Sequence, residues 1–88
     1  MPDQTRTPLE ALEAVLALAF GGVAARMAAH FGVSDQTVSW WRKGERDGRP
    51  VLFPAELCPA CERLTNRQVR CEELRPDVAW DILRIQVA

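Results

Sequence analysis

Between positions 28 and 41 the sequence places a small residue, a glycine and two apolar residues at a spacing that strongly restricts the local fold. Ala28 allows two helices to approach closely, and Gly32, four positions later, tolerates the positive φ of a tight turn. Val38 and Trp41 are three residues apart, which places both on one side of a following helix. Two short helices joined by a tight turn, the second held by its inner face, are typical of a helix-turn-helix.

Helices are expected before and within this unit. Thr7-Pro8-Leu9-Glu10 has the pattern of a capping box, and Gly21-Gly22 ends the helix that it begins. Residues 23–31 predict a short helix, and Ser34 is the expected N-cap of the next helix, which Gly44 ends. Apolar residues recur every three or four positions in the first helix and predict its buried face: Leu9, Leu12, Val15, Leu16, Ala19 and Phe20.

The second half of the chain predicts shorter and less regular elements. Residues 45–52 are polar with Gly and Pro and predict a loop. A fourth helix is expected from about Pro54, with Pro59 distorting its first turns. Its buried face is expected to hold Leu57, Cys61 and Leu64.

The remaining segments are a connector over 66–70, one helical turn over 71–75, and a tail. Residues 78–87 mix apolar and charged side chains without a clean period, so they favour neither helix nor strand.

A chain of 88 residues predicts one domain spanning 1–88, with 1–6 as a disordered lead-in and 79–88 as a tail of undefined structure. The sequence has neither an export signal nor a run of about 20 apolar residues. We therefore expect a cytoplasmic protein with no membrane partner. An odd number of cysteines, three, favours reduced thiols in that compartment.

The charge is distributed unevenly along the chain. The formal net charge of −1 argues against general affinity for nucleic acid. Residues 26–49, however, carry five basic and three acidic side chains, whereas the segments on either side are net acidic. The basic middle is compatible with a local DNA contact.

Residues 32–41, with the sequence GVSDQTVSWW, resemble the helix-turn-helix of the Cro/CI-type phage repressors. Residues 49–51, 54–60 and 69–78, together with Trp80, are similar to the Cro-like, YdaS-type regulators of bacterial prophages. The resemblance implies an all-α, lambda-repressor-like domain of about five short helices. It further implies a homodimer that binds double-stranded operator DNA and represses transcription, in a lysogeny or toxin–antitoxin setting.

The same resemblance assigns roles to individual residues. The residues expected to face base edges are Asp35, Gln36, Ser39 and Trp40. The residues expected to contact phosphates are Arg26, Ser34, Thr37, Arg42, Lys43, Arg46 and Arg49. Gln36 is suited to a bidentate contact with adenine, whereas Asp35 is equally explained by the preference for a carboxylate at a helix N-terminus. The basic side chains are also explained as a solvated charged surface.

Two positions depart from the family pattern. The helix before the turn often begins with a glutamine that contacts a phosphate, and this chain has Ala24 there. Trp40 occupies an outward position that is usually polar. A thymine methyl, a partner subunit and simple shielding of the helix all remain open as its role.

Two other functions remain as alternatives. The chain could be an antitoxin whose tail, residues 80–87, binds a toxin protein. It could also be a thiol redox or zinc protein that uses the C-x-x-C pair Cys58 and Cys61. Only Cys71 and His30 remain as further metal ligands, so packing of the thiols in the core is the favoured interpretation. We expect no cofactor, no metal, no catalytic residue and no enzymatic activity.

Overall fold

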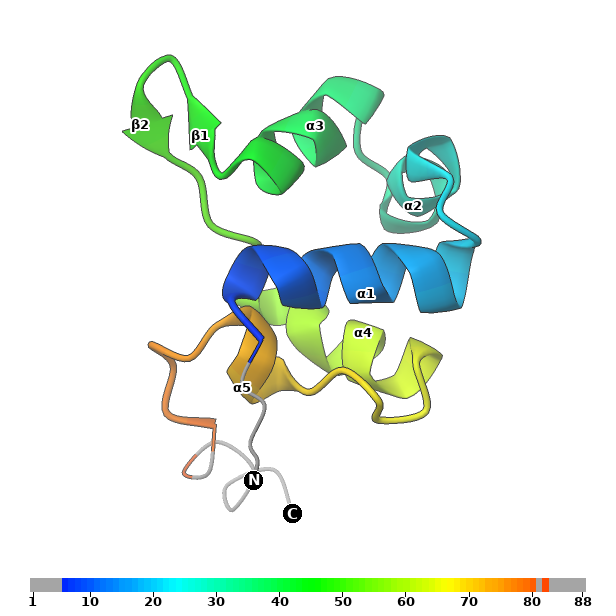
Figure 1. The fold of residues 1–88 in the computed structure, drawn as a ribbon, viewed down its shortest axis with the longest axis vertical. Coiled ribbons are helices and arrows are strands. Elements are labelled where there is room, and N and C mark those ends of the chain that lie inside the picture. The colour runs from blue at the N-terminus through cyan, green and yellow to red at the C-terminus, as the bar shows by residue number, and fades with distance from the viewer. Residues whose placement is uncertain (1–5, 81, 83–88) are drawn as a thin grey trace.

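The computed structural model describes residues 6–80 and 82. These residues form short helices and one small hairpin, so the expected all-α class is confirmed (Figure 1). The helices are α1 (Pro8–Phe20), α2 (Ala24–Phe31), α3 (Asp35–Lys43), α4 (Cys58–Leu64) and α5 (Cys71–Leu74). The strands are β1 (Glu45–Arg46) and β2 (Arg49–Pro50), and a 3₁₀ turn, η1 (Ala55–Leu57), precedes α4.

Helix α1 lies at the centre of the fold. Figure 1 shows α2, α3 and the hairpin on one side of α1, with α4 and α5 on the other. Because it packs on two sides, α1 buries a broader face than the predicted stripe. Leu9, predicted to be buried, is 42% exposed, and Ala19 is only half-buried. The buried residues of α1 are Ala11, Leu12, Val15, Leu16 and Phe20.

The predicted helix ends of the first half are confirmed. The Thr7 N–H donates to Glu10 Oε1 at 2.9 Å, and the Glu10 N–H donates to Thr7 Oγ1 at 3.1 Å, which completes the capping box. Gly21 caps the other end of α1 with a φ of 61°, in the left-handed region where glycine carries no steric cost. Helix α2 begins one residue later than predicted, because Val23 has extended backbone angles.

The prediction of an irregular loop over residues 45–52 is wrong. Strands β1 and β2 pair antiparallel, with Glu45 opposite Pro50 and Arg46 opposite Arg49. Asp47 and Gly48 form the two-residue turn with φ of 51° and 77°, and this pair of positive angles matches the twist of a hairpin. The polar composition of this segment is thus compatible with a hairpin as well as with a loop.

The prediction for the fourth helix needs two corrections. Helix α4 begins at Cys58, with Pro59 in its first turn, where a missing N–H costs nothing, so Pro59 starts the helix and does not distort it. The 3₁₀ turn before it changes the helical phase. Cys61 is buried as predicted, but Leu57 is half-buried and Leu64 is 40% exposed. Cys58 takes the inward position instead.

The three cysteines are free thiols in the core. Burial raises the pKa of Cys58 and of Cys61 to about 12, with smaller contributions from neighbouring groups such as Cys71. Both thiols are therefore protonated near neutral pH, whereas thiol exchange and zinc binding use the thiolate. The interpretation of these residues as core packing is confirmed, and no group of three or more His, Cys, Asp or Glu that could hold a metal ion lies within the described residues.

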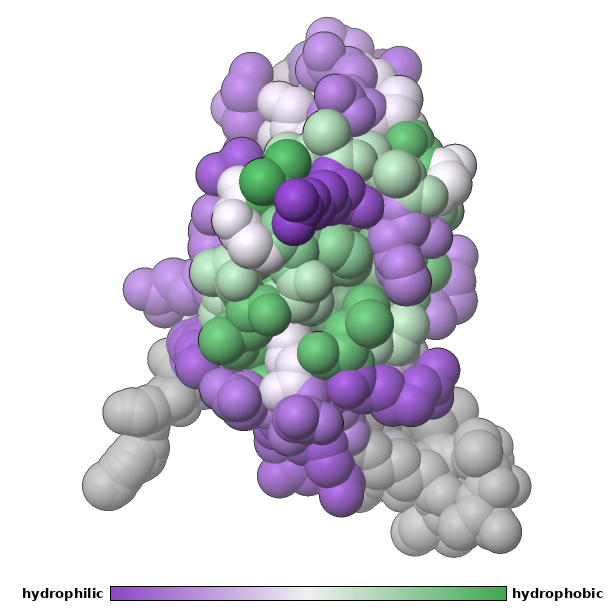
Figure 2. All heavy atoms as spheres, turned by 90° about the vertical axis from the view of Figure 1, so that its right-hand side faces the viewer, coloured by the Kyte–Doolittle hydropathy of each residue, from purple (hydrophilic) through white to green (hydrophobic). Residues whose placement is uncertain are grey.

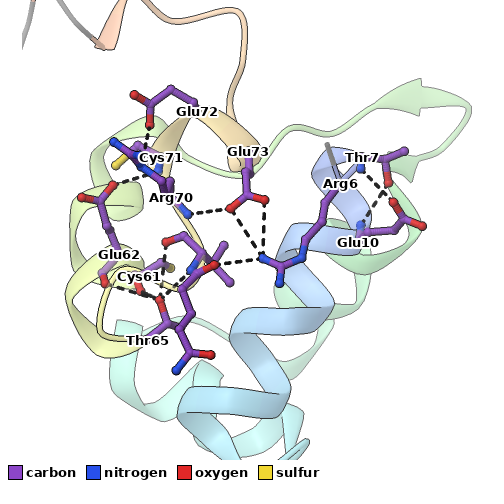
Figure 3. Close-up of polar contacts among 12 residues, drawn as sticks. Arg6, Thr7, Glu10, Cys61, Glu62, Thr65, Arg70, Cys71, Glu72 and Glu73 are labelled. Atoms are coloured by element: carbon purple, nitrogen blue, oxygen red, sulfur yellow. Dashed lines mark hydrogen bonds and ion pairs between the residues drawn. The ribbon is translucent and has the colours of Figure 1, made fainter. Parts of the chain in front are cut away.

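Polar side chains connect α4, α5 and the start of α1 (Figure 3). The buried Thr65 hydroxyl donates to the Cys61 carbonyl at 2.9 Å and accepts the Val69 N–H at 3.1 Å. Glu62 Oε1 accepts the Cys71 N–H at 3.0 Å, which fixes the start of α5. These bonds hold the connector between the two helices, which contains little regular structure of its own.

Arg6, the first described residue, and Trp80, near the end of the described part, are both hydrogen-bonded to the rest of the fold. Arg6 Nη1 donates to the Gln68 carbonyl at 3.1 Å, so the predicted disordered lead-in does not extend to Arg6, and residues 1–5 lie outside the described residues. Trp80 is buried and its indole N–H donates to the Arg75 carbonyl at 2.7 Å. Apart from Ile82, the tail beyond Trp80 lies outside the described residues.

One face of the molecule carries an apolar area. Figure 2 shows hydrophobic side chains gathered at the centre of the face where α1 ends, surrounded by hydrophilic ones. Elements that reach this end of the fold carry large apolar side chains that remain exposed: Leu18, Val23 and Leu64. Among the described residues no single helix is long and apolar enough to cross a membrane, and the one pair that together passes on length and composition, α1 with α2, is bent by 87°.

Replacing Thr65 by valine is expected to destabilise the fold. The shape of the side chain is kept, but the buried Val69 N–H loses its acceptor, which costs about 1–3 kcal/mol. Urea unfolding followed by circular dichroism measures the change. Thr65→Ser keeps the hydroxyl and is the matched control. Equal stability of Thr65→Val and the parent protein would show that this hydrogen bond contributes nothing.

Candidate nucleic-acid interface

Helices α2 and α3 meet at a tight turn with the predicted geometry. Ala28 is buried where the helices approach, and its carbonyl accepts the Val33 N–H at 2.9 Å. Gly32 has a φ of 69°, which a side chain would make unfavourable. The small residue and the glycine therefore have the roles that their spacing predicted.

The start of α3 is held by two hydroxyl groups. Ser34 Oγ accepts the Thr37 N–H at 3.1 Å, which confirms Ser34 as the N-cap. The hydroxyls of Ser34 and Thr37 also lie 2.9 Å apart and share a hydrogen bond. Both predicted phosphate contacts thus lie side by side at the N-terminus of α3, where the helix dipole favours an anion.

Val38 and Trp41 hold the inner face of α3. Val38 is fully buried, and the Trp41 ring packs edge-on against Phe53, with centroids 4.9 Å apart and an interplanar angle of 75°. These contacts fix the rotation of α3 about its axis. The opposite face then presents the four predicted base-reading residues, of which the first two are exposed and the last two half-buried: Asp35, Gln36, Ser39 and Trp40.

Arg42 has a partner that sequence reasoning missed. Its Nε donates to Glu13 Oε2 at 2.6 Å and its Nη2 donates to Glu13 Oε1 at 3.2 Å, so the guanidinium holds the carboxylate through two bonds. The hydrogen bonds that Arg42 donates to Glu13 raise the pKa of Arg42. The pair joins α3 to α1 across 29 positions of sequence, and no local pattern indicates it.

Arg46 lies over Trp40. The guanidinium carbon is 4.0 Å from the centroid of the Trp40 ring, within the range of a cation–π interaction. This contact connects β1 with the outer face of α3 and covers one side of the ring. It brings together one predicted base-reading residue and one predicted phosphate contact.

The other predicted phosphate contacts lie on separate elements. Lys43 is exposed at the end of α3, and Arg49 is exposed on β2. Neither forms an ion pair with any residue that the structure describes. Arg26 is exposed on α2, whose N-cap Val23 provides no side-chain cap. The first N–H groups of α2 therefore have no side-chain acceptor from Val23.

His30 belongs to an aromatic cluster. Its ring centroid lies 5.5 Å from that of Phe20 and 5.1 Å from that of Phe31. Both distances are typical of packed aromatic pairs. His30 is exposed as well as packed against these rings, which fits a histidine at the edge of the core.

Two comparisons with known proteins give a match. The model of a family described as "Bacterial toxin YdaS" matches residues 15–83. A relative in Escherichia coli (strain K12), named "Putative transcriptional regulator YdaS", is 52% identical over 64 residues. That alignment covers 73% of this chain and 59% of the relative, so it spans less than two thirds of the relative's length. No solved structure matches the chain.

The family match covers most of the chain, including α2, α3, the hairpin, α4 and α5. The 52% identity with this relative is far above the level at which a shared fold is in doubt. On both findings, the chain belongs to the YdaS family.

Proposed function

We propose that α2 and α3 form a helix-turn-helix and that the chain is a non-enzymatic transcriptional regulator that binds operator DNA. The observation that carries the proposal is the fixed rotation of α3: Val38 and Trp41 bury one face, and Gln36 stands exposed on the other. The name of the Escherichia coli relative, which describes a transcriptional regulator, supports the same role.

In this proposal α3 enters the major groove by its N-terminal end. Gln36 makes a bidentate contact with adenine N6 and N7, and Ser39 donates to a base acceptor. Asp35 accepts from cytosine N4 or compensates the helix dipole. Trp40, with one ring face under Arg46, contacts a thymine methyl with its remaining exposed edge.

The phosphate contacts surround this helix. Lys43 and Arg49 are the best placed, since neither is paired within the part of the chain that the structure describes. The hydroxyls of Ser34 and Thr37 and the N-terminus of α2 with Arg26 add contacts that need little net charge. Arg42 already contacts Glu13, and Arg46 already contacts Trp40. Each side chain would have to share or break that contact to reach a phosphate, so both contribute less.

The tail offers little support for the antitoxin alternative. The description of the family names a toxin, so the family match is what connects this chain with toxin systems. Trp80, proposed as the start of a toxin-gripping tail, is buried and hydrogen-bonded to the Arg75 carbonyl. The rest of that segment, apart from Ile82, lies outside the described residues. We therefore keep DNA-dependent regulation as the proposal.

We expect the protein to bind as a homodimer with half-sites about 34 Å apart. The exposed apolar side chains on the face of Figure 2 offer surface for a second copy. Selection of bound duplexes from a random pool should then give a palindromic consensus. A single asymmetric site, or no enrichment, would contradict the dimer or the DNA binding, respectively.

Replacing Gln36 by alanine should remove discrimination at one base pair of each half-site. The expected loss is about 1–3 kcal/mol for each half-site of the selected duplex, with binding to random DNA unchanged. Fluorescence anisotropy titration measures both. Gln68→Ala, an exposed glutamine of the connector after α4, is the matched control and should bind like the parent. If Gln36→Ala also bound like the parent, α3 would not be the helix that reads bases.

Replacing Lys43 by alanine should weaken binding to every duplex by a similar factor. Each lost phosphate contact reduces the magnitude of the slope of log K against log salt by about 0.9, so the proposed dimer, which loses one contact per subunit, should show a reduction of about 1.8. Arg63→Ala removes an exposed charge from α4, on the other side of α1, and should leave the slope unchanged. Lys43 is a cleaner probe than Arg42, because Arg42→Ala would also break the ion pair between α3 and α1. Equal slopes for Lys43→Ala and the parent would argue against contact at the end of α3.

A further inference from the structure

The β1–β2 hairpin is firmly positioned relative to α3. Only Gly44 separates the last residue of α3 from the first residue of β1. The Gly44 carbonyl accepts the Val51 N–H at 2.9 Å, which closes the base of the hairpin. The stack of Arg46 on Trp40 adds a side-chain contact from β1 to α3. Because no free linker lies between them, the direction of α3 also sets the direction of the hairpin.

Two arginines stand directly opposite each other on this small element. Arg46 and Arg49 are cross-strand partners, so their side chains leave the hairpin on the same face. Like charges at opposite positions of a strand pair are destabilising. A hollow of about 410 Å³ lies beside them, lined by Arg46, Asp47, Arg49, Pro50 and Val51. An anionic ligand at this face would relieve the repulsion.

The two arginines differ in the contacts that their side chains make. Arg46 lies on the Trp40 ring, which holds it toward α3, and its Nε is 3.9 Å from Oδ2 of the exposed Asp47 in the turn. Arg49 is exposed and forms no ion pair with a described residue. Arg46 is thus suited to position the hairpin, and Arg49 to reach a ligand beyond it.

The length of α3 places the hairpin at the edge of the major groove. Nine residues of helix span about 13 Å, and the major groove is about 12 Å wide. If the N-terminal end of α3 enters the groove, its C-terminal end therefore lies near the sugar-phosphate backbone, and the hairpin lies beyond it. The adjacent minor groove is about 6 Å wide, and it is narrowest and most negative in A·T-rich sequences.

We propose that Arg49 enters the minor groove beside the site read by α3 and selects A·T-rich flanks, with Arg46 as the positioning residue that fixes the hairpin on Trp40. This inference rests on the proposed DNA binding and adds a second reading site to it. It goes beyond a phosphate contact, because a phosphate contact carries no sequence preference.

Modified bases test the proposal without altering the major-groove contacts of the core. The duplex selected by the full chain is prepared with A·T, G·C and inosine·C pairs in its flanks. Inosine lacks the guanine N2 amine, so an inosine·C pair resembles A·T in the minor groove and G·C in the major groove. The parent protein should bind the A·T and inosine·C flanks with similar affinity, and the G·C flank about fivefold more weakly.

Arg49→Ala should bind all three duplexes with equal affinity, while Arg63→Ala keeps the preference of the parent. Arg46→Ala should reduce the preference, since the hairpin loses its contact with Trp40. If Arg49→Ala weakens all three duplexes by one factor and the preference persists, Arg49 contacts phosphate only and the proposal is overturned. An inosine·C flank that behaves like G·C places the readout in the major groove and also overturns it.

The same titrations separate this proposal from the function on which it rests. Equal binding of all flanks by the parent, together with the expected loss for Gln36→Ala, leaves the DNA-binding proposal intact and excludes the minor-groove contact. Failure of the parent to prefer any selected duplex over random DNA removes both.

Discussion

The edge-on contact between Trp41 and Phe53 is the interaction on which the candidate interface depends. Both rings are buried, and Phe53 also packs edge-on against Phe31 of α2. Phe53 therefore holds α2, α3 and the segment that leaves the hairpin at one point. Aromatic pairs of this kind contribute about 0.5–1.5 kcal/mol beyond the area they bury. Trp40, one position earlier, is turned by about 100° around the helix and takes part in the outer face instead.

Some of the basic side chains around this interface have acidic neighbours, which reduces its local positive charge. Arg42 is paired with Glu13, and Arg46 lies near Asp47, so two of the five basic residues of the middle segment have an acidic neighbour. A protein with few free cations gains little non-specific affinity, because that affinity comes from counterion release. Within the proposed function, recognition would then depend more on the fit of α3 and the hairpin than on electrostatic attraction. The net charge of −1 is compatible with that arrangement.

Sequence reasoning succeeded where the determining contacts are local. The Thr7 capping box, the Ser34 cap and the glycines at helix ends act within a few residues of chain, so their patterns are visible in the sequence. The Asp47-Gly48 pair is also a local hairpin signal, although the polar composition around it is equally typical of a loop. The Arg42–Glu13 pair joins positions 29 apart, and the Trp40–Arg46 stack needs the hairpin to turn back on α3. Neither contact follows from local spacing, because both depend on how the elements pack.

The buried framework of the fold and the outer face of α3 are under different constraints. The family match spans both sides of α1, so it covers the framework as well as α3. That framework is held by buried contacts, such as those of Thr65 and Trp80, which constrain the sequence through packing and hydrogen bonding. Gln36 on the outer face of α3 is exposed, and changes at exposed positions cost little stability. Within the proposed function, the base-reading residue Gln36 can therefore be exchanged without disturbing the framework.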